Sequence, residues 1–527
     1  MNKLYSVKKL ICLLIILLGS PMLWGQTAEE QAKLELKKAQ EALLEAKKQE
    51  AIAKMSRCDC GSRHHSCKNY SLPDLIAIKS WKVEDENVQG LLAKEAYELS
   101  LANNLKPSYL VYEAVYKAIN NLQEKTKNNP DFNALDQVPI GLERLGRVRA
   151  IKISPDNTKI YTVGSDGYLL GRQLSIYGSR KEKRDKANKP EILAKNNKVS
   201  RTLDISPNGQ YLASAGDGGS ISLFNLEKGE VELDIRFPNQ KRIWSLAFLP
   251  KENGIVSAVD KGNGKTAIFY TNLKGESTPI IEETDFMIRS IVPSQDGNYL
   301  AGVGKSSEVP IWNIKTQKQE FTLKDPRTEI TATAVAISPK GRFVVVGYQD
   351  GSIRIWDMNK YSDYEEGESP ERMLYHNATI SDLEFSKDGT ILVVGSLDKS
   401  ATLWTIRDTD HAGEDNDKEF PFEDPRFQPI KFEDHEDWVT SVAFSNDGLR
   451  VVTGCADGVL KIWETDMGVY ANQICELVDK NLSDRDWRKY IGTDDKESKD
   501  LYILTGDDKR RTPLSTCGNS VPQMESK

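Results

Sequence analysis

Histidine is scarce in this sequence, and the usual signatures of catalysis are missing. Its 527 residues include five histidines, and no serine lies in a G-x-S-x-G turn, which exposes the nucleophile of many hydrolases. Such a chain offers few groups from which an active site could be built. We therefore predict that the protein is not an enzyme, with no catalytic residues, no cofactor and no bound metal.

Glycine is missing where a phosphate-binding loop would need it. The fragments 264–266 and 304–306 read Gly-Lys-Thr and Gly-Lys-Ser. A P-loop requires another glycine five residues earlier, so that backbone N–H groups can surround a phosphate. Val259 and Tyr299 occupy those positions. Neither fragment is therefore expected to bind a nucleotide.

A surplus of basic residues is also absent. Lysine and arginine number 71, aspartate and glutamate number 78, and the formal net charge is −7. Dedicated nucleic-acid binders usually carry a clear basic excess, so we expect no nucleic-acid partner. Hydrophobic residues make up 39% of the chain, enough for a large core.

The apolar run near the N-terminus is too short to cross a bilayer. It covers residues 10–19, after Lys3, Lys8 and Lys9 and before Pro21, whereas a spanning helix needs roughly 20 apolar residues. A basic start followed by a short apolar run is typical of a signal peptide. We expect residues 1–25 to be cleaved and the protein to be exported to the periplasm or envelope. An uncleaved anchor is the alternative.

Cysteine is rare, and six of the seven lie beyond the predicted signal. Three cluster in the Cys/His-rich segment 58–70, at Cys58, Cys60 and Cys67. Thiolates with the two histidines there would suit zinc, but the spacing is not a common structural zinc pattern and an oxidising compartment favours disulfides. We favour a disulfide or free thiols over a metal, and pairing between two chains stays open.

Two helical regions are expected before the main domain. Residues 26–57 have alanine and leucine at coiled-coil spacing, interpreted as a spacer or coiled-coil helix. Residues 71–133 contain two or three helices, one of them marked by Leu92, Ala96 and Leu99 on a single face.

A repeat dominates the rest of the chain. An alternating apolar strand, a tight turn, a second apolar strand, a further turn and a third strand recur seven times. The first turns begin at residues 154, 206, 249, 294, 338, 386 and 445, which are 52, 43, 45, 44, 48 and 59 residues apart. The shorter intervals match a four-stranded blade of about 40–45 residues. The fold class is therefore mainly β, a seven-bladed propeller over residues 134–470.

From about residue 138 to 470 the sequence resembles the WD-repeat family, most clearly at 347–357 and 454–463. That family ties the strands of a blade with His, Ser or Thr, Asp and Trp side chains. In the sixth blade Val394 stands where the hydroxyl is expected, and the third and fourth blades match poorly. The resemblance assigns structural roles to His435, Thr453, Asp457 and Trp463 in the last blade, to His376, Asp398 and Trp404 in the sixth, and to Asp350 and Trp356 in the fifth.

The family also implies how the ring closes. It usually takes one outer strand from the segment before the first blade, and residues 138–143 suit that role. They read like residues 428–433, which we expect to enter the last blade. Ile140 and Leu142 alternate so that both side chains lie on one face of the sheet.

The C-terminal extension, residues 471–527, resembles the segment that closes the WD-repeat halves of bacterial STAND-type signalling NTPases, through residues 475–478, 481–483 and 487–490. The helices at 71–124 resemble the linker of those proteins, but their NTPase module is absent. Cys475 and Cys517 flank the segment that carries the resemblance, and we predict a possible disulfide between them.

The function expected from this organisation is a non-enzymatic protein–protein interaction scaffold of the cell envelope or periplasm. The basic stretch 178–198 and the acidic stretch 407–424 are the first candidates for contact with protein partners. One alternative is a sensor or signalling subunit that binds a small ligand or peptide through the propeller. Another is a propeller-based hydrolase or lyase. The oligomeric state, the partner and the pathway stay open.

Overall fold

The computed structural model describes residues 72–102, 108–126, 137–138, 146–174, 190–196, 198–237, 242–251, 254–324, 329–358, 372–405, 429–433, 435–478 and 485. The predicted signal peptide, spacer helix, Cys/His-rich segment and acidic stretch lie outside these residues. The chain divides into two compact units, one made of Met1–Ala118 with Ile474–Lys527 and the other of Ile119–Gln473. They are described separately.

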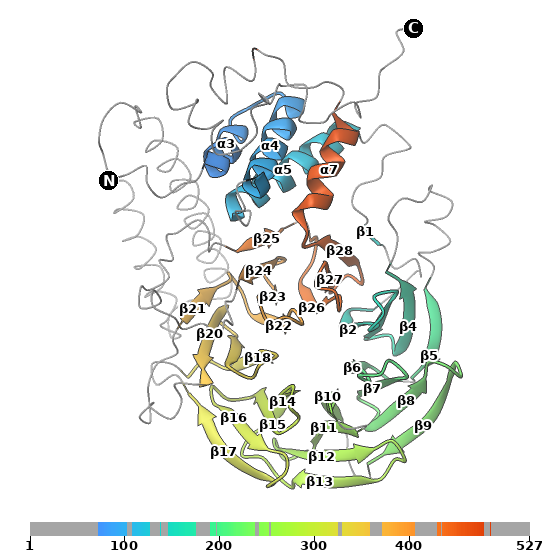
Figure 1. The fold of residues 1–527 in the computed structure, drawn as a ribbon. Helices are drawn as coiled ribbons and strands as arrows, with labels where there is room; N and C mark the ends of the chain where they lie inside the picture. Colours follow the sequence, from blue (N-terminus) through green and yellow to red (C-terminus); the bar gives the residue numbers. More distant parts are fainter. Residues whose placement is uncertain are drawn as a thin grey trace, which may run out of the picture. The chain divides into compact units, whose positions relative to one another are not determined.

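The larger unit is a ring of seven four-stranded antiparallel sheets, which confirms the seven-bladed propeller (Figure 1). Blade 1 contains β2 (Val148–Ile153), β3 (Lys159–Gly164), β4 (Tyr168–Gln173) and β5 (Glu191–Lys195). Blade 2 contains β6 (Ser200–Ile205), β7 (Tyr211–Gly216), β8 (Ser220–Asn225) and β9 (Glu230–Arg236). Blade 3 contains β10 (Ile243–Phe248), β11 (Gly254–Asp260), β12 (Thr266–Asn272) and β13 (Ser277–Ile281).

The remaining blades follow the same order. Blade 4 contains β14 (Ile288–Pro293), β15 (Tyr299–Gly304), β16 (Val309–Asn313) and β17 (Lys318–Leu323). Blade 5 contains β18 (Ala332–Ile337), β19 (Phe343–Tyr348), β20 (Ser352–Asp357) and β21 (Arg372–Tyr375). Blade 6 contains β22 (Ile380–Phe385), β23 (Ile391–Ser396), β24 (Ala401–Thr405) and β25 (Ile430–Phe432). Blade 7 combines β26 (Val439–Phe444), β27 (Arg450–Cys455) and β28 (Leu460–Glu464) with β1 (Gln137–Val138).

The recurrent Ser-x-Asp-Gly turns have a physical cause that the sixth blade illustrates. The hydroxyl of Ser386 donates to Asp388 Oδ1 (2.6 Å) and accepts the N–H of Ile391 (3.0 Å), which starts the next strand. Gly389 adopts φ 73°, a left-handed conformation that favours glycine. Five other turn serines accept the same kind of backbone N–H bond: Ser154, Ser206, Ser294, Ser338 and Ser445.

The second strand of each blade is buried on both faces, because neighbouring blades cover it. All six residues of β19 are buried, which explains its unbroken apolar run. Between blades 5 and 6, Val345 and Ile353 share one apolar cluster with Ile380, Leu383 and Leu392. Such clusters between adjacent blades make up the core of this unit.

Strand pairing closes the ring between the two ends of the repeat array. β1 pairs with β28, with Gln137 opposite Lys461 and Val138 opposite Leu460. The sequence predicted that the closing strand pairs with β28. It placed that strand at residues 138–143, with Ile140 and Leu142 at its centre, and these two residues lie outside the described residues. The hydroxyl of Thr440 in blade 7 also donates to the carbonyl oxygen of Val148 in blade 1 (2.7 Å).

Two strands correct the sequence interpretation. The segment that we expected to enter the last blade forms β25, the outer strand of blade 6. It resembles residues 138–143 because both segments precede the inner strand of the next blade. The stretch 178–198, expected as a loop insertion, contains β5 at its end, and β5 pairs with β4 as the outer strand of blade 1. Its Ile-Leu-Ala run fits a strand better than a solvated loop.

The smaller unit is helical where it is described. α3 (Leu72–Ser80) and α4 (Glu86–Ala102) pack together, and α5 (Tyr109–Thr126) follows. Asp85 caps α4, since its Oδ1 accepts the N–H groups of Asn87 (3.0 Å) and Val88 (3.2 Å). At the start of α5, the hydroxyl of Ser108 donates to Asp74. No helix among the described residues is long and apolar enough to span a membrane.

A further helix, α7 (Met467–Leu477), begins inside the predicted propeller and continues past residue 470. Asp466 caps it by accepting the N–H of Gly468 (2.8 Å). Cys475 near its end is disulfide-bonded, but Cys517 lies outside the described residues, so their pairing stays a prediction.

The pairing of β1 with β28 can be tested by two deletions made behind the same export signal. Deleting residues 1–144 removes β1, so β28 becomes an unpaired sheet edge and the protein should aggregate. Deleting residues 26–130 keeps β1 and should leave the propeller soluble. Soluble yield and the midpoint of thermal unfolding measure the difference. Equal yields and midpoints would show that another segment closes the ring.

Candidate functional site

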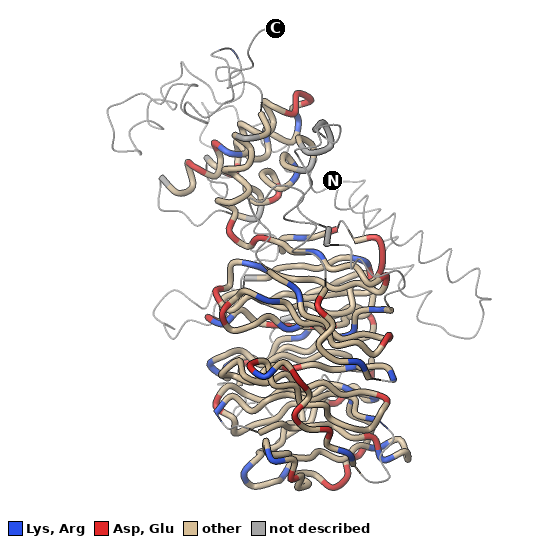
Figure 2. Tube along the Cα trace, turned by 90° about the vertical axis from the view of Figure 1, so that its right-hand side faces the viewer, with Lys and Arg blue, Asp and Glu red and all other residues tan. Residues whose placement is uncertain are grey.

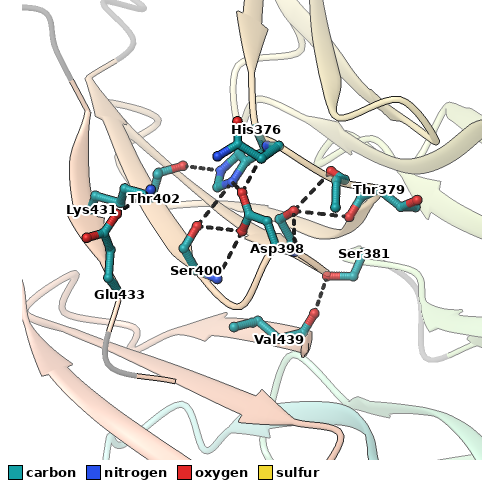
Figure 3. A network of polar contacts seen from close by, with 12 residues as sticks. His376, Thr379, Ser381, Asp398, Ser400, Thr402, Lys431, Glu433 and Val439 are labelled. Carbon is teal, nitrogen blue, oxygen red and sulfur yellow. Dashed lines mark hydrogen bonds and ion pairs between the residues drawn. The ribbon is translucent and has the colours of Figure 1, made fainter. Parts of the chain in front are cut away.

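The histidine of blade 6 belongs to a network of polar side chains (Figure 3). His376 Nδ1 lies 3.0 Å from Asp398 Oδ2, and His376 Nε2 lies 2.7 Å from Thr402 Oγ1. Trp404 Nε1 donates to the same Thr402 oxygen at 2.8 Å, and Ser400 Oγ donates to Asp398 Oδ1 at 2.6 Å. One orientation satisfies the whole chain of bonds: the indole N–H to the hydroxyl, the hydroxyl to the imidazole, and the imidazole N–H to the carboxylate.

Thr402 supplies the hydroxyl that the sequence interpretation found missing at Val394. The two residues are direct partners across the β23–β24 ladder. The hydroxyl therefore comes from the facing strand β24 instead of β23, and it contacts the imidazole of His376. The alternation of Thr402 with Trp404 was the available signal, because residues two apart on a strand share a face.

Blade 7 forms its network from the other strand of the pair. His435 Nε2 lies 2.8 Å from Thr453 Oγ1, which also accepts the Trp463 indole N–H at 3.0 Å. Asp457 lies in the following turn, where its Oδ1 accepts the N–H of Val459 (2.9 Å). The Trp463 ring stacks on Phe432 of β25, with 4.3 Å between ring centroids. This network thus also links blade 7 to the outer strand of blade 6.

The residues predicted for blade 5 play simpler parts. Asp350 Oδ1 accepts both the backbone N–H (2.9 Å) and the hydroxyl (2.6 Å) of Ser352, which fixes the turn into β20. Trp356 is buried in the apolar cluster between blades 4 and 5. Beside it, Asp357 accepts hydrogen bonds from Arg342.

The polar environment of blade 6 also sets the charge of Asp398. Burial acts to raise the pKa of this carboxyl, but the hydrogen bonds from His376, Ser400 and the Asn377 N–H hold that pKa well below its ordinary value. Asp398 is therefore an ionised acceptor at neutral pH. Both ring nitrogens of His376 are engaged within the blade, so this imidazole holds strands together.

The channel along the axis of the propeller contains a cavity of about 600 Å³. The inner strands of the blades line it, and Figure 1 shows these strands nearest the centre of the ring. Within it, Lys152 Nζ lies 3.7 Å from Asp204 Oδ1 and 3.5 Å from Glu384 Oε2. These three side chains come from blades 1, 2 and 6 and form a charged layer across the channel.

The acidic groups of the channel also join neighbouring blades. Asp204 accepts the N–H of Phe248 (2.7 Å), which ties blade 2 to blade 3. Asp382 accepts a hydrogen bond from the hydroxyl of Ser441 (2.9 Å), which links blade 6 to blade 7. On the outside of the propeller, acidic and basic residues are interspersed (Figure 2).

The state of Lys152 bears on chemistry in the channel. The charge of Glu384 raises the pKa of Lys152, burial opposes this, and Asp204 adds to the rise. Lysines that act as nucleophiles or bases have lowered pKa values, whereas Lys152 keeps its proton and serves as a fixed cation. No group of three His, Cys, Asp or Glu side chains suited to a metal occurs among the described residues.

The repeats match a known family. Residues 193–225, 317–357, 368–405 and 428–464 match the model of the WD domain, G-beta repeat. These four segments of the chain are therefore similar to WD40 repeats. The matched segments run from the outer strand of one blade to the third strand of the next, as seen for β25 to β28. All of blade 3 and strands β14 to β16 of blade 4 lie outside the matches, in agreement with the weak pattern expected for these two blades. Strands β2 to β4 of blade 1 also lie outside them, which the sequence pattern did not indicate.

Parts of this chain are also similar to curated proteins. The Target of rapamycin complex subunit wat1 of Schizosaccharomyces pombe is 22% identical over 259 residues, which are 42% of this chain and 78% of the relative. Eukaryotic translation initiation factor 3 subunit I of Aspergillus niger is 26% identical over 208 residues, 39% of this chain and 50% of the relative. Protein LST8 homolog of Drosophila melanogaster is 24% identical over 258 residues, which are 48% of this chain and 75% of the relative.

Exchanging the side chains of Thr402 and Val394, which face each other across the β23–β24 ladder, tests the role of Thr402. Thr402→Val removes the hydroxyl that serves both His376 and Trp404, and should destabilise the protein by about 1–3 kcal/mol, as expected for buried groups left without a partner. Adding Val394→Thr to this variant places a hydroxyl at the position that Thr453 has in blade 7. We expect the double variant to regain most of the lost stability.

The midpoint of urea unfolding measures these changes. Thr278→Val, on the exposed side of the outer strand β13, is the matched control and should change stability by less than about 0.5 kcal/mol. A Thr402→Val variant as stable as this control, or a double variant no better than the single one, would contradict the assignment.

Proposed function

We propose that the protein is a non-enzymatic scaffold for protein–protein interactions. The observation that carries this proposal is the closed ring, in which each blade is fixed by its neighbours. A rigid platform binds a partner with little loss of conformational entropy. The described histidines of blades 6 and 7 and the lysine of the channel are engaged in maintaining that platform.

Three successive junctions show how the inner strands are fixed. The hydroxyl of Thr333 donates to the carbonyl of Ile380, and that of Ser381 to the carbonyl of Val439, both at 2.7 Å. Thr440 makes the same bond to Val148. Each bond joins the second residue of one inner strand to the first residue of the next. Blades 5, 6, 7 and 1 therefore hold a fixed spacing around the channel.

The relatives support the same proposal. Two of them are named as subunits, one of the target of rapamycin complex and one of eukaryotic translation initiation factor 3. This chain spans about half the length of the initiation factor subunits that it matches. We infer that it too works as a subunit, with partners of its own.

We further propose that the protein is exported and works in the periplasm or at the envelope. The N-terminal pattern of basic residues and a short apolar run supports this, as does the disulfide at Cys475, since such bonds persist in oxidising compartments. The helices α3 to α5 and the segment after residue 470 would then correspond to the linker and closing extension of STAND-type proteins.

Capture of the native protein tests the scaffold. The full chain with a C-terminal tag is isolated from envelope fractions of the source organism under native conditions, and its partners are identified by mass spectrometry. We expect at least one protein in stoichiometric amount that an identically tagged, unrelated exported protein does not retain. A chain that elutes alone and turns over a small ester, glycoside or uronide substrate would instead establish the hydrolase or lyase alternative.

N-terminal sequencing of the mature protein tests export. Cleavage after Gly25 should leave Gln26 as the first residue, and the protein should appear in the soluble part of the envelope fraction. An intact Met1 in a membrane pellet that resists salt washing would contradict cleavage and support the anchor.

A further inference from the structure

One position in every inner strand is displaced from the strand ladder. The pairing of each inner strand with the second strand of its blade shifts register at the second residue. Such a bulge aims its side chain away from the regular alternation. The residues concerned all line the channel: Arg149, Arg201, Trp244, Arg289, Thr333, Ser381 and Thr440.

These seven positions divide into two groups. In blades 5 to 7 they carry small hydroxyl side chains, which donate to the carbonyl at the start of the next inner strand. In blades 1 to 4 they carry three arginines and a tryptophan, too large for that bond. In blades 5 to 7, the side chains at the channel opening therefore join neighbouring blades. In blades 1 to 4, guanidinium groups and an indole line the opening.

The arginines gather around Trp244. The guanidinium carbons of Arg201, Arg289 and the adjacent Arg242 lie 5.0, 5.4 and 4.6 Å from the centre of its ring. These distances are within the range of cation–π attraction. We call Arg149, Arg201, Arg242, Trp244 and Arg289 the arginine mouth.

The positive charge of the arginine mouth exceeds its negative charge. Asp217 lies 2.6 Å from Nε of both Arg201 and Arg242. Among the described residues, no ion pair joins Arg149 or Arg289 to a carboxylate. Burial and the charges of Arg201 and Arg147 lower the pKa of Arg149, a sign that cations crowd one another there.

Two buried donors in the mouth also lack an acceptor. Arg149 Nε and Trp244 Nε1 are shielded from solvent and hydrogen-bond to no described protein group. A buried N–H without an acceptor is costly, and an anion would satisfy both the donor and the surplus charge.

The charged layer around Lys152 limits where such an anion can lie. Lys152, Asp204 and Glu384 are each three residues further along strands that start at the mouth, about 10 Å deeper at 3.3 Å per residue. Asp382 adds a third carboxyl near that layer, against the single cation Lys152. Burial raises the pKa of Asp382 and of Glu384, but this layer still offers an anionic ligand less positive charge than the mouth does, so the mouth is the favoured place.

We propose that the arginine mouth binds the carboxylates of an acidic segment of a partner polypeptide. The inference rests on the scaffold function and names the chemistry of its partner. Asp217 already shows the preferred contact, one carboxylate shared by two guanidinium groups. The four arginines come from four successive blades along one side of the opening, so they suit several carboxylates along a chain better than one compact ion.

Fluorescence anisotropy of a labelled octaglutamate peptide with the full chain tests the proposal. Binding should weaken as salt rises from 50 to 200 mM. The Debye length, over which exposed charges still interact, is about 10 Å at 100 mM and about 8 Å at 150 mM, so salt weakens charge attraction in this range. Arg289→Glu should weaken binding by about tenfold to a hundredfold, the worth of one charged hydrogen bond. Arg289 is exposed, so its substitution should leave the thermal midpoint unchanged.

Arg236→Glu is the matched control. It makes the same charge change on the outer strand β9, where Arg236 is 82% exposed, and should leave affinity within about twofold of wild type. A second variant, Trp244→Phe, keeps the ring but removes the indole N–H and should weaken binding less than Arg289→Glu.

Four outcomes would overturn the proposal. Equal losses for Arg289→Glu and Arg236→Glu would show nonspecific attraction. Inorganic phosphate that competes at lower concentration than free octaglutamate would make the mouth a small-anion site, and tighter binding of a single-stranded oligonucleotide would make it a nucleic-acid site. The scaffold itself is judged separately, since a captured partner retained by the Arg289→Glu variant would refute the mouth and leave the scaffold intact.

Discussion

Closure of the ring is the constraint on which the rest of this structure depends. Each blade has apolar side chains on both faces and can bury them only between two neighbours. The pairing of β1 with β28 gives the last blade its fourth strand and brings blade 7 against blade 1. Without that pairing, the first and last blades would each expose an apolar face, and the channel would become an open groove.

Inside the closed ring, polar groups do two kinds of work. The networks around His376 and His435 hold strands together within a blade, and the hydroxyl and carboxylate bonds of the inner strands hold one blade to the next. Because the imidazoles and Lys152 are used for stability, the surface left for recognition is the part that these bonds do not occupy. Within the channel, that part includes the opening lined by arginines in blades 1 to 4.

Much of this fold could be predicted from sequence, because turns and alternation are local. Ser386, Asp388 and Gly389 form a turn through bonds among neighbouring residues. Turns with such a serine marked every blade except the third, even where family similarity was weak. The closing strand was harder to place, since only a few residues of a short segment pair with β28. The hydroxyl of Thr402 was missed because the sequence interpretation looked for it only at Val394, on β23. Thr402 lies opposite Val394 on β24 and reaches the same imidazole, and this pairing is not visible in the sequence.

The arginine mouth could not be predicted from sequence for a related reason. Arg149, Arg201 and Arg289 are separated by about 50 to 90 residues and lie in ordinary strand patterns. Each is unremarkable alone, and the charge surplus arises only when the ring brings the second residues of the inner strands together. The net charge of −7 also concealed it, since acidic residues elsewhere outnumber the local cations.

The bulge at the second residue of each inner strand has a consequence for how such proteins diversify. A residue outside the ladder can be exchanged without breaking a backbone pair, so its side chain is nearly independent of the stability of its blade. In blades 1 to 4 these side chains do not make the bond to the carbonyl of the next inner strand that Thr333, Ser381 and Thr440 make. Gene duplication followed by substitution at four such sites could therefore produce paralogues with different partners on one unchanged framework.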